Sequence, residues 1–305
     1  MGRLVSQTVL YSVIVAVVFC ILVSGANGYS DAFYLRFTTP PQSSMILGTS
    51  RAAQGLLPQV LDQYVPTKFF NYSFTIAHSP YGEVYYNSIL HKLDSRSKNG
   101  IFIVAVDPWS LSAVVTRDSF ESEFPEAHLL LANTKFVNLN PNIPYIIQNF
   151  KGKYYTLIAP QKRELLLHDN GWLEVSVPMD SESVLRRTTA KFKEYKEENL
   201  PNRKISATRL KYFAKTIDTL KKHGEVYIVR LPAHSKIIEM EHQLAPNFDS
   251  LIQPVVAKVN GYLDLAKQSE SYVYTDGNHL YKESGAKLSE KVGQWIAQQR
   301  SENKE

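Results

Sequence analysis

Residues 44–53 read SMILGTSRAA, and this stretch carries the clearest sign of the fold. Ser44 to Leu47 predicts a short buried strand, and Gly48 permits the tight turn that follows it. From Ala52 to Tyr64 apolar side chains recur at helical spacing, so a helix is expected directly after the turn. A strand that runs straight into a helix in this way is typical of an α/β domain.

The rest of the chain continues this alternation. A second strand is expected at 68–74 and a helix at 81–93, and a β-branched run at 101–106 has the composition of a buried parallel strand. The order predicts an α/β fold with a mostly parallel, doubly wound sheet. Further on, the pattern predicts a helix at 206–222, a strand at 225–231, a final short strand at 271–274 and a closing helix at 283–298.

Two segments depart from this rhythm. Residues 108–183 contain prolines, glycines and scattered aromatic side chains, so an insertion of short elements is expected there. Residues 183–223 hold 12 Lys or Arg against 4 acidic residues, an excess larger than the net charge of +5 of the whole chain. The basic face expected on the helix at 206–222 is either simply solvated or contacts an acidic partner such as lipid headgroups.

Composition excludes several classes of protein. The chain has 305 residues, of which 44% are apolar, unlike a disordered or collagen-like chain. The balance of 34 basic and 29 acidic residues is too mild to indicate a nucleic-acid partner. The single cysteine, Cys20, rules out a disulfide framework and a zinc-finger array. The histidines show no metal-ligand spacing, so no metal site is expected.

An apolar segment near the N-terminus predicts contact with a membrane through residues 4–25. The 18 residues from Thr8 to Gly25 would span about 27 Å as a helix. Since Arg3 precedes the segment and Asp31 is the first charge after it, the bulk of the chain is expected outside the cytoplasm, periplasmic or extracellular.

Three interpretations of this segment compete. The long apolar run favours an uncleaved anchor, whereas Ala26-Asn27-Gly28 has the form of a signal-peptidase site, which would give a secreted protein. The third is a buried helix. The domain organisation expected is residues 1–30 as anchor or signal segment, 31–43 as linker, and 44–300 as one α/β domain.

Ser50, Asp276 and His279 are the candidates for catalysis. The expected turn places the Ser50 hydroxyl at a helix N-terminus, where N–H groups favour a developing negative charge, although serine is also a common N-cap. Asp276 and His279 lie in one loop after the expected last strand. A general base needs an imidazole near the hydroxyl and a carboxylate to hold its tautomer. Because parallel strands end at one edge of the sheet, the three residues are expected to meet there.

The sequences around these residues resemble blocks of the SGNH (GDSL-type) hydrolases. Residues 46–55, ILGTSRAAQG, resemble the first block, with Thr49 in place of the usual Asp. Residues 276–280, DGNHL, resemble the last block, and the order Ser, Asp, His matches the family. The likeness covers about residues 44–296, apart from the insertion.

This resemblance implies a three-layer α/β/α domain of the SGNH/flavodoxin-like type. It implies that Ser50 is the nucleophile, His279 the base and Asp276 the acid that orients it. It also implies ester hydrolysis or acyl transfer without a metal or organic cofactor. The tethered form resembles envelope proteins that work beside systems for acylating polysaccharide or teichoic acid.

The chain departs from the family where the oxyanion donors are expected. The family usually uses a Gly after the second strand and an Asn after the third, and this chain has Asn71-Tyr72-Ser73 and Asp107-Pro108-Trp109 there. An anionic Asp107 would oppose an oxyanion. Either Asn71 or Ser73 compensates together with the Ser50 backbone N–H, or the enzyme is slow or inert. Arg51 is expected to pair with Asp107 or with an anionic substrate.

The expected function is that of an exported serine esterase or O-acyltransferase acting on acyl esters, such as acetyl esters, of envelope or extracellular glycans. The alternative is a catalytically inert accessory protein that binds a glycan or a membrane partner. A third is a structural envelope protein whose basic helix lies on lipid headgroups. The expected partners are an acylated carbohydrate or small ester, the membrane, and a membrane-bound acyltransferase.

Overall fold

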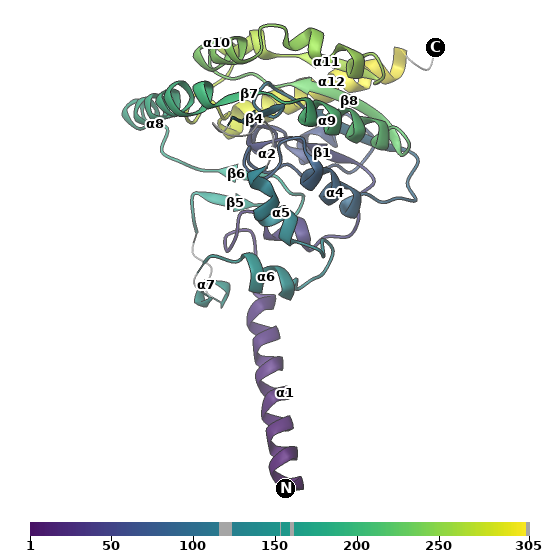
Figure 1. The fold of residues 1–305 in the computed structure, drawn as a ribbon, viewed down its shortest axis with the longest axis vertical. Helices are drawn as coiled ribbons and strands as arrows, with labels where there is room; N and C mark the ends of the chain where they lie inside the picture. The colour runs from purple at the N-terminus through teal and green to yellow at the C-terminus, as the bar shows by residue number, and fades with distance from the viewer. Residues whose placement is uncertain (116–123, 153, 159–161, 303–305) are drawn as a thin grey trace.

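The central sheet of the computed structural model has five parallel strands, as the alternation of strand and helix predicted (Figure 1). The structure describes residues 1–115, 124–152, 154–158 and 162–302. The strands lie in the order β2-β1-β3-β8-β9, and each pairs with its neighbour in parallel. Their bounds are β1 (Met45–Leu47), β2 (Phe70–Asn71), β3 (Gly100–Ala105), β8 (Gly224–Arg230) and β9 (Gly261–Asp264).

The strand order brings the segments after β1 and β3 together. From β1 the chain first goes outward to β2 and then crosses back to β3 on the other side of β1. The register sets Leu47 opposite Val104, so both strands end at one edge. Where connections from adjacent strands diverge in this way, a crevice opens at the carboxyl edge, and ligands bind there.

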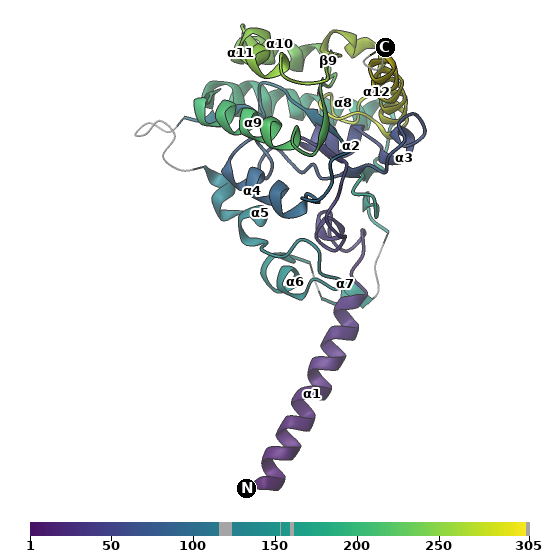
Figure 2. The ribbon, with the colours of Figure 1, turned by 90° about the vertical axis from the view of Figure 1, so that its right-hand side faces the viewer.

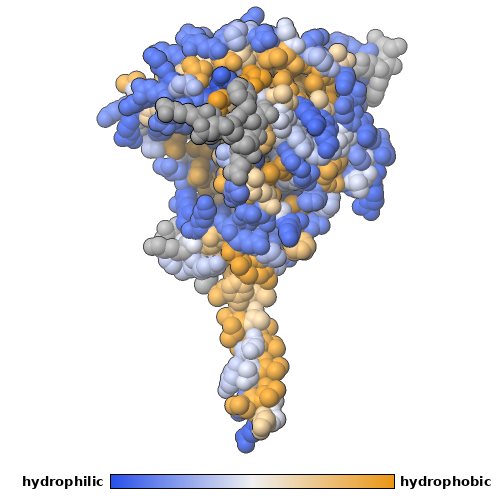
Figure 3. Space-filling view, viewed as in Figure 1, coloured by the Kyte–Doolittle hydropathy of each residue, from blue (hydrophilic) through white to orange (hydrophobic). Residues whose placement is uncertain are grey.

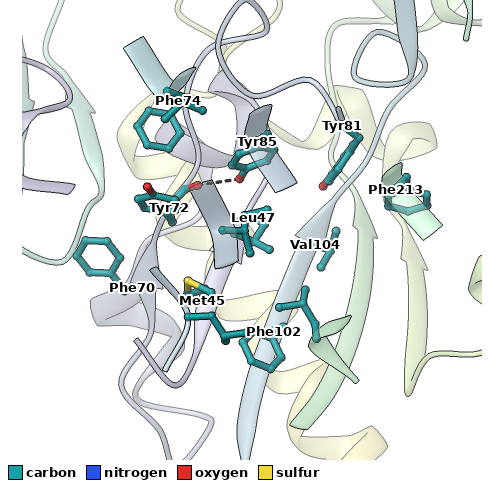
Figure 4. Packing of buried hydrophobic residues seen from close by; sticks show 14 of the residues in the cluster. Met45, Leu47, Phe70, Tyr72, Phe74, Tyr81, Tyr85, Phe102, Val104 and Phe213 are labelled. Atoms are coloured by element: carbon teal, nitrogen blue, oxygen red, sulfur yellow. Dashed lines mark hydrogen bonds between the residues drawn. The ribbon is translucent and has the colours of Figure 1, made fainter. Parts of the chain in front are cut away.

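Apolar side chains cover both faces of the sheet, because successive residues of a strand point to opposite sides. Leu47 belongs to one buried cluster, which Figure 4 shows in part, and its neighbour Ile46 belongs to another. The first cluster includes residues of α4 (Glu83–Lys92), α9 (Ala207–Leu220) and α11 (Phe248–Val256), and the second includes residues of α2 (Ser50–Gly55), α3 (Pro58–Leu61) and α12 (Lys282–Glu302).

Two expected elements near β1 are shorter in the structure. The helix expected at 52–64 is divided into α2 and α3, because the backbone is extended at Leu56 and Leu57 before Pro58 begins the second helix. Proline has no N–H to continue a helix, but it fits a first helical position. The strand expected at 68–74 is reduced to the two residues of β2.

The expectation of a final strand at 271–274 is wrong. The fifth strand is β9, and it is followed by the 3-10 helix η5 (Ala266–Ser271). In the expected strand only Tyr274 pairs, in a single bridge with Leu280, and Val273 is exposed. β9 has no run of β-branched residues and is only half-buried at the sheet edge, so its composition does not signal a strand.

Three further helices have no counterpart among the expected elements: α8 (Ser181–Lys193), α10 (Ser235–Leu244) and α11 (Phe248–Val256). No residue of α8 is buried, which explains why its sequence lacks an apolar stripe. The segment expected to be an insertion holds short elements. In the described part of the segment these are β4 (Ser112–Val114), the 3-10 helix η2 (Pro125–His128), α5 (Leu130–Asn133), α6 (Ile143–Asn149), α7 (Tyr155–Ile158), β5 (Leu165–Leu167) and β6 (Leu173–Val175). Strand β4 pairs with β7 (Arg203–Ile205).

Helix α1 (Gly2–Ser24) extends away from the rest of the protein (Figures 1 and 2). It is long and apolar enough to cross a membrane: an 18-residue window has a mean hydropathy of 2.3, and none of it is buried. Figure 3 shows apolar residues along most of its length. After α1, the 3-10 helix η1 (Tyr34–Phe37) buries Tyr34 and Phe37 in the first cluster. Residues 31–43, which were expected to form a linker, therefore pack against the domain.

Candidate active site

Three side chains from distant parts of the chain meet beyond the end of β1. The Ser50 hydroxyl donates to His279 Nε2 at 2.8 Å, across a separation of 229 residues. On the other side of the ring, His279 Nδ1 lies 2.9 Å from Asp276 Oδ2 and 3.1 Å from Oδ1. The structure therefore brings the predicted Ser50, His279 and Asp276 into one hydrogen-bonded row.

The turn before Ser50 is held from two sides. Gly48 has a φ of +152°, and a Cβ there would lie 2.9 Å from side chains of α2 and of β3, so the turn requires glycine. Its N–H donates to the Tyr85 hydroxyl at 3.1 Å, and its carbonyl accepts from Ser79 Oγ at 2.7 Å. Tyr85 reaches across from α4 and donates in turn to the Tyr72 carbonyl at 2.7 Å (Figure 4). These contacts fix the position of the hydroxyl.

The loop that carries the acid and the base is closed on itself. Gly277, at φ +81°, allows the tight bend. Asp276 Oδ1 accepts the backbone N–H groups of Asn278 at 3.0 Å and of His279 at 2.9 Å. The Thr275 N–H donates to the His279 carbonyl at 2.9 Å. The Asp-x-x-His spacing thus lets one carboxylate cap the turn and still reach the ring.

The electrostatics suit a general base. Burial alone would raise the pKa of the Asp276 carboxyl, but the His279 ring and the hydrogen bonds from His279 and Asn278 outweigh burial and hold that pKa below its ordinary value of 3.8. An ionised carboxylate accepts only, so Nδ1 carries the ring proton and Nε2 keeps its lone pair toward Ser50. This arrangement can take the proton of the hydroxyl as the oxygen attacks an acyl carbon.

Arg51 points away from the nucleophile and into the protein. Its side chain is only 5% exposed, its Nη1 donates to Glu241 Oε1 at 2.6 Å, and its Nε donates to Asn278 Oδ1 at 2.9 Å. Asp107 Oδ2 is farther away, 3.9 Å from Nη1. Burial alone would lower the pKa of the Arg51 guanidinium, but the charges of Glu241 and Asp107 outweigh it and raise that pKa. The expected pairing with Asp107 is present, but the closer partner is Glu241.

Asp107 lies at the carboxyl edge and offers no donor there. Its Oδ1 accepts the Ser110 N–H at 2.8 Å, and Ser110 Oγ donates to the Asp107 carbonyl at 2.7 Å, which closes the turn after β3. With Oδ2 facing Arg51, both carboxylate oxygens have partners.

The two side chains expected to compensate for Asp107 are used elsewhere. Asn71 Nδ2 donates to the carbonyls of Ala52 and Leu56, each at 2.9 Å, and both of its N–H groups are thereby occupied. Ser73 Oγ donates to the Ile46 carbonyl at 3.3 Å. Both side chains are fully buried, so they hold β1, β2 and α2 together and supply no donor to a substrate.

Sequence reasoning missed Asn278 and Glu241. Asn278 Nδ2 lies 3.2 Å from His279 Nε2, which puts an amide donor beside the ring nitrogen that faces Ser50. Its place inside the Asp-x-x-His loop is the signal that would have marked it. Glu241 is fully buried on α10 and also accepts from Arg230 Nη2 at 3.0 Å. It lies 190 residues from Arg51, and no local pattern indicates that pairing.

A mostly apolar hollow of about 460 Å³ lies against the same loop. It is lined by Tyr274 and Gly277 from the loop, by His234 before α10, and by Met179, Leu185 and other residues of the α8 region. None of Ser50, Asp276 and His279 lines this hollow, so it adjoins the loop of the acid and the base without containing either side chain.

Among the residues that the structure describes, no group of three His, Cys, Asp or Glu side chains is placed to hold a metal ion. No family model matches the chain, and no match to it is found among curated proteins.

Proposed function

We propose that the protein is a serine ester hydrolase or O-acyltransferase of the SGNH type. The observation that carries the proposal is the row Ser50–His279–Asp276, with contacts of 2.8 and 2.9 Å, an ionised carboxylate, and a serine that begins α2 after the turn that ends β1. Ser50 is the nucleophile, His279 the general base and Asp276 the acid that orients the ring. The strand order, the helices on both faces of the sheet and the motif positions support a three-layer, flavodoxin-like domain.

The proposed substrates are acyl esters, such as acetyl esters, of glycans at or outside the membrane. Helix α1 supports an anchored enzyme, because it leaves the domain as a continuous apolar rod. An enzyme held in this way meets surface polymers and acyl carriers that arrive at the membrane, including those of a membrane-bound acyltransferase. The choice between water and a second hydroxyl as acceptor would decide between hydrolysis and transfer.

Labelling by a fluorophosphonate probe tests this proposal. The probe reacts with an activated serine, so the full-length protein in detergent is expected to form one covalent adduct, on the peptide that contains Ser50. The Ser50→Ala variant should form none. A matched control is Ser95→Ala, since Ser95 is exposed and far from the triad in sequence. Absence of an adduct on the unaltered protein would overturn the proposal.

The pH dependence follows from the low pKa of Asp276. Since that carboxyl stays ionised well below neutral pH, Asp276 takes up no proton between pH 8 and pH 5 and adds nothing to the acid limb of the rate profile. We expect kcat/KM for p-nitrophenyl acetate to fall along a limb of unit slope, about tenfold per pH unit at the acid end. A limb of slope two would show that Asp276 titrates in the same range and would contradict the arrangement.

The proposed topology places the domain outside the cytoplasm. Cys20 lies in α1, so exchanging it for alanine leaves a thiol-free background. In that background, a Ser95→Cys variant is expected to react with a membrane-impermeant maleimide in intact cells, while a Met1 extension carrying a cysteine reacts only after lysis. The reverse pattern would place the domain in the cytoplasm.

A second function is favoured by one observation. Asp107 stands where the family has an amide donor, and Asn71 and Ser73 are bonded to carbonyls. A protein without an oxyanion site would be an inert member of the class that binds a glycan or a membrane partner. Such a protein would bind its ligand and remain unlabelled by the fluorophosphonate.

A further inference from the structure

The proposed reaction needs a hydrogen-bond donor to the oxyanion, and the residues after the second and third strands, where SGNH hydrolases have such donors, do not supply one. When Ser50 Oγ bonds to the acyl carbon, its proton passes to His279 Nε2 and the carbonyl π electrons move onto oxygen. That oxygen needs N–H donors, and each is worth about 10²–10³ in turnover. The Ser50 backbone N–H precedes the first bonded N–H groups of α2, those of Ala52 and Ala53, and can supply one. A second is required from elsewhere.

We propose that Asn278 Nδ2 is that second oxyanion donor, an inference that rests on the proposed function. Asn278 Nδ2 lies 3.2 Å from His279 Nε2, and Nε2 lies 2.8 Å from Ser50 Oγ. The amide nitrogen is therefore no more than about 6 Å from the attacking oxygen. Asn278 is only 3% exposed, so its amide acts away from competing water.

The orientation of this amide is set by Arg51. A guanidinium has donors only, so the atom of Asn278 that Arg51 Nε approaches at 2.9 Å must be the carbonyl oxygen. The NH₂ group therefore faces the triad. Arg51 is in turn fixed by the buried Glu241 carboxylate, and its charge polarises the amide and strengthens it as a donor.

The reaction itself frees this donor. In the resting site the Ser50 hydroxyl and the Asn278 amide both face the single lone pair of Nε2. Once Nε2 takes the serine proton it becomes a donor, and the Asn278 N–H loses its acceptor there. At the same step the carbonyl oxygen gains its negative charge. The amide thus becomes available when the oxyanion forms, and it stabilises the transition state more than the ground state.

Two variants test the proposal in the full-length protein. Asn278→Asp keeps the oxygen that Arg51 holds but removes the N–H donor, and Asn278→Ala removes both. We expect each to lower kcat for p-nitrophenyl acetate by about 10²–10³ with little change in KM, and to slow fluorophosphonate labelling in parallel. Asn133→Ala, an exposed asparagine, is the matched control and should retain the wild-type rate.

The outcomes separate the alternatives. A rate loss in both variants, with thermal unfolding preserved and with the acid limb of the pH profile unmoved in Asn278→Ala, supports an oxyanion donor. If Asn278→Asp keeps the wild-type rate while Asn278→Ala loses it, the residue only positions its neighbours through Arg51 and the inference is overturned. The inference would also be overturned if Asn278→Ala shifted the acid limb of the pH profile but kept the wild-type kcat at the plateau. If the unaltered protein is neither labelled nor active, the proposed function itself has failed, which is a different result.

Discussion

Replacing Ser50 by alanine is expected to lower kcat for p-nitrophenyl acetate by about 10⁶, to the level set by binding alone. The hydroxyl is the group that donates to His279 Nε2 at 2.8 Å, and the described residues offer no second hydroxyl at that nitrogen. Alanine keeps the helical backbone of α2 and removes one partly buried polar contact, so folding should be retained. Steady-state hydrolysis, corrected for the uncatalysed rate, measures the effect.

The control for this prediction is again Ser95→Ala, which should keep the wild-type kcat. Thermal unfolding of Ser50→Ala should stay within a few degrees of the unaltered protein, because a single hydrogen bond contributes about 1 kcal/mol. An active Ser50→Ala variant would show that the ester is cleaved by another group and would remove the basis of the proposed mechanism.

Replacing Glu241 by alanine is expected to lower the free energy of unfolding by about 3–5 kcal/mol. The carboxylate is fully buried and accepts from two guanidinium groups, Arg51 at 2.6 Å and Arg230 at 3.0 Å. Its loss leaves Arg51 with only the more distant Asp107 at 3.9 Å to balance a buried charge. Urea unfolding followed by circular dichroism measures the change.

A matched control lies on the same helix. Glu239 is exposed on α10, so Glu239→Ala should change the free energy of unfolding by no more than about 0.5 kcal/mol. Glu241→Gln keeps the shape but not the charge and is expected to fall between the two. Equal stability of Glu241→Ala and Glu239→Ala would contradict the view that this carboxylate balances the buried arginines.

Much of the fold was predictable because strands β1, β3 and β8 are short apolar runs bounded by turn residues. Such runs have few other ways to bury their side chains, so composition alone indicates parallel strands. The strand β9 was not predictable, since its half-buried residues pair only along β8 at the sheet edge. Helix α8 was missed for the related reason that none of its residues is buried.

The residues of the candidate site also fall into those that the sequence predicted and those whose roles it did not predict. Ser50 was predictable from the strand, the glycine turn and the helix around it, and Asp276 and His279 from their spacing within one loop. The interpretation of Asn71 and Ser73 as donors depended on their place near the end of the second strand. The structure shows both side chains bonded to main-chain carbonyls, and a linear sequence does not record which carbonyls lie near.

The sequence by itself determined the class of fold, the apolar helix near the N-terminus and the three residues with matching chemistry, because each depends on local pattern. Only the tertiary structure decided that Ser50 and His279 lie 2.8 Å apart and that Glu241 holds Arg51 against Asn278. Those contacts join residues that are about 190 to 229 positions apart. The physical reason is that the order of strands, the packing of α12 on the sheet and the packing of α10 against Trp109 and Tyr195 set which distant polar groups share a buried space, and no short-range preference does so.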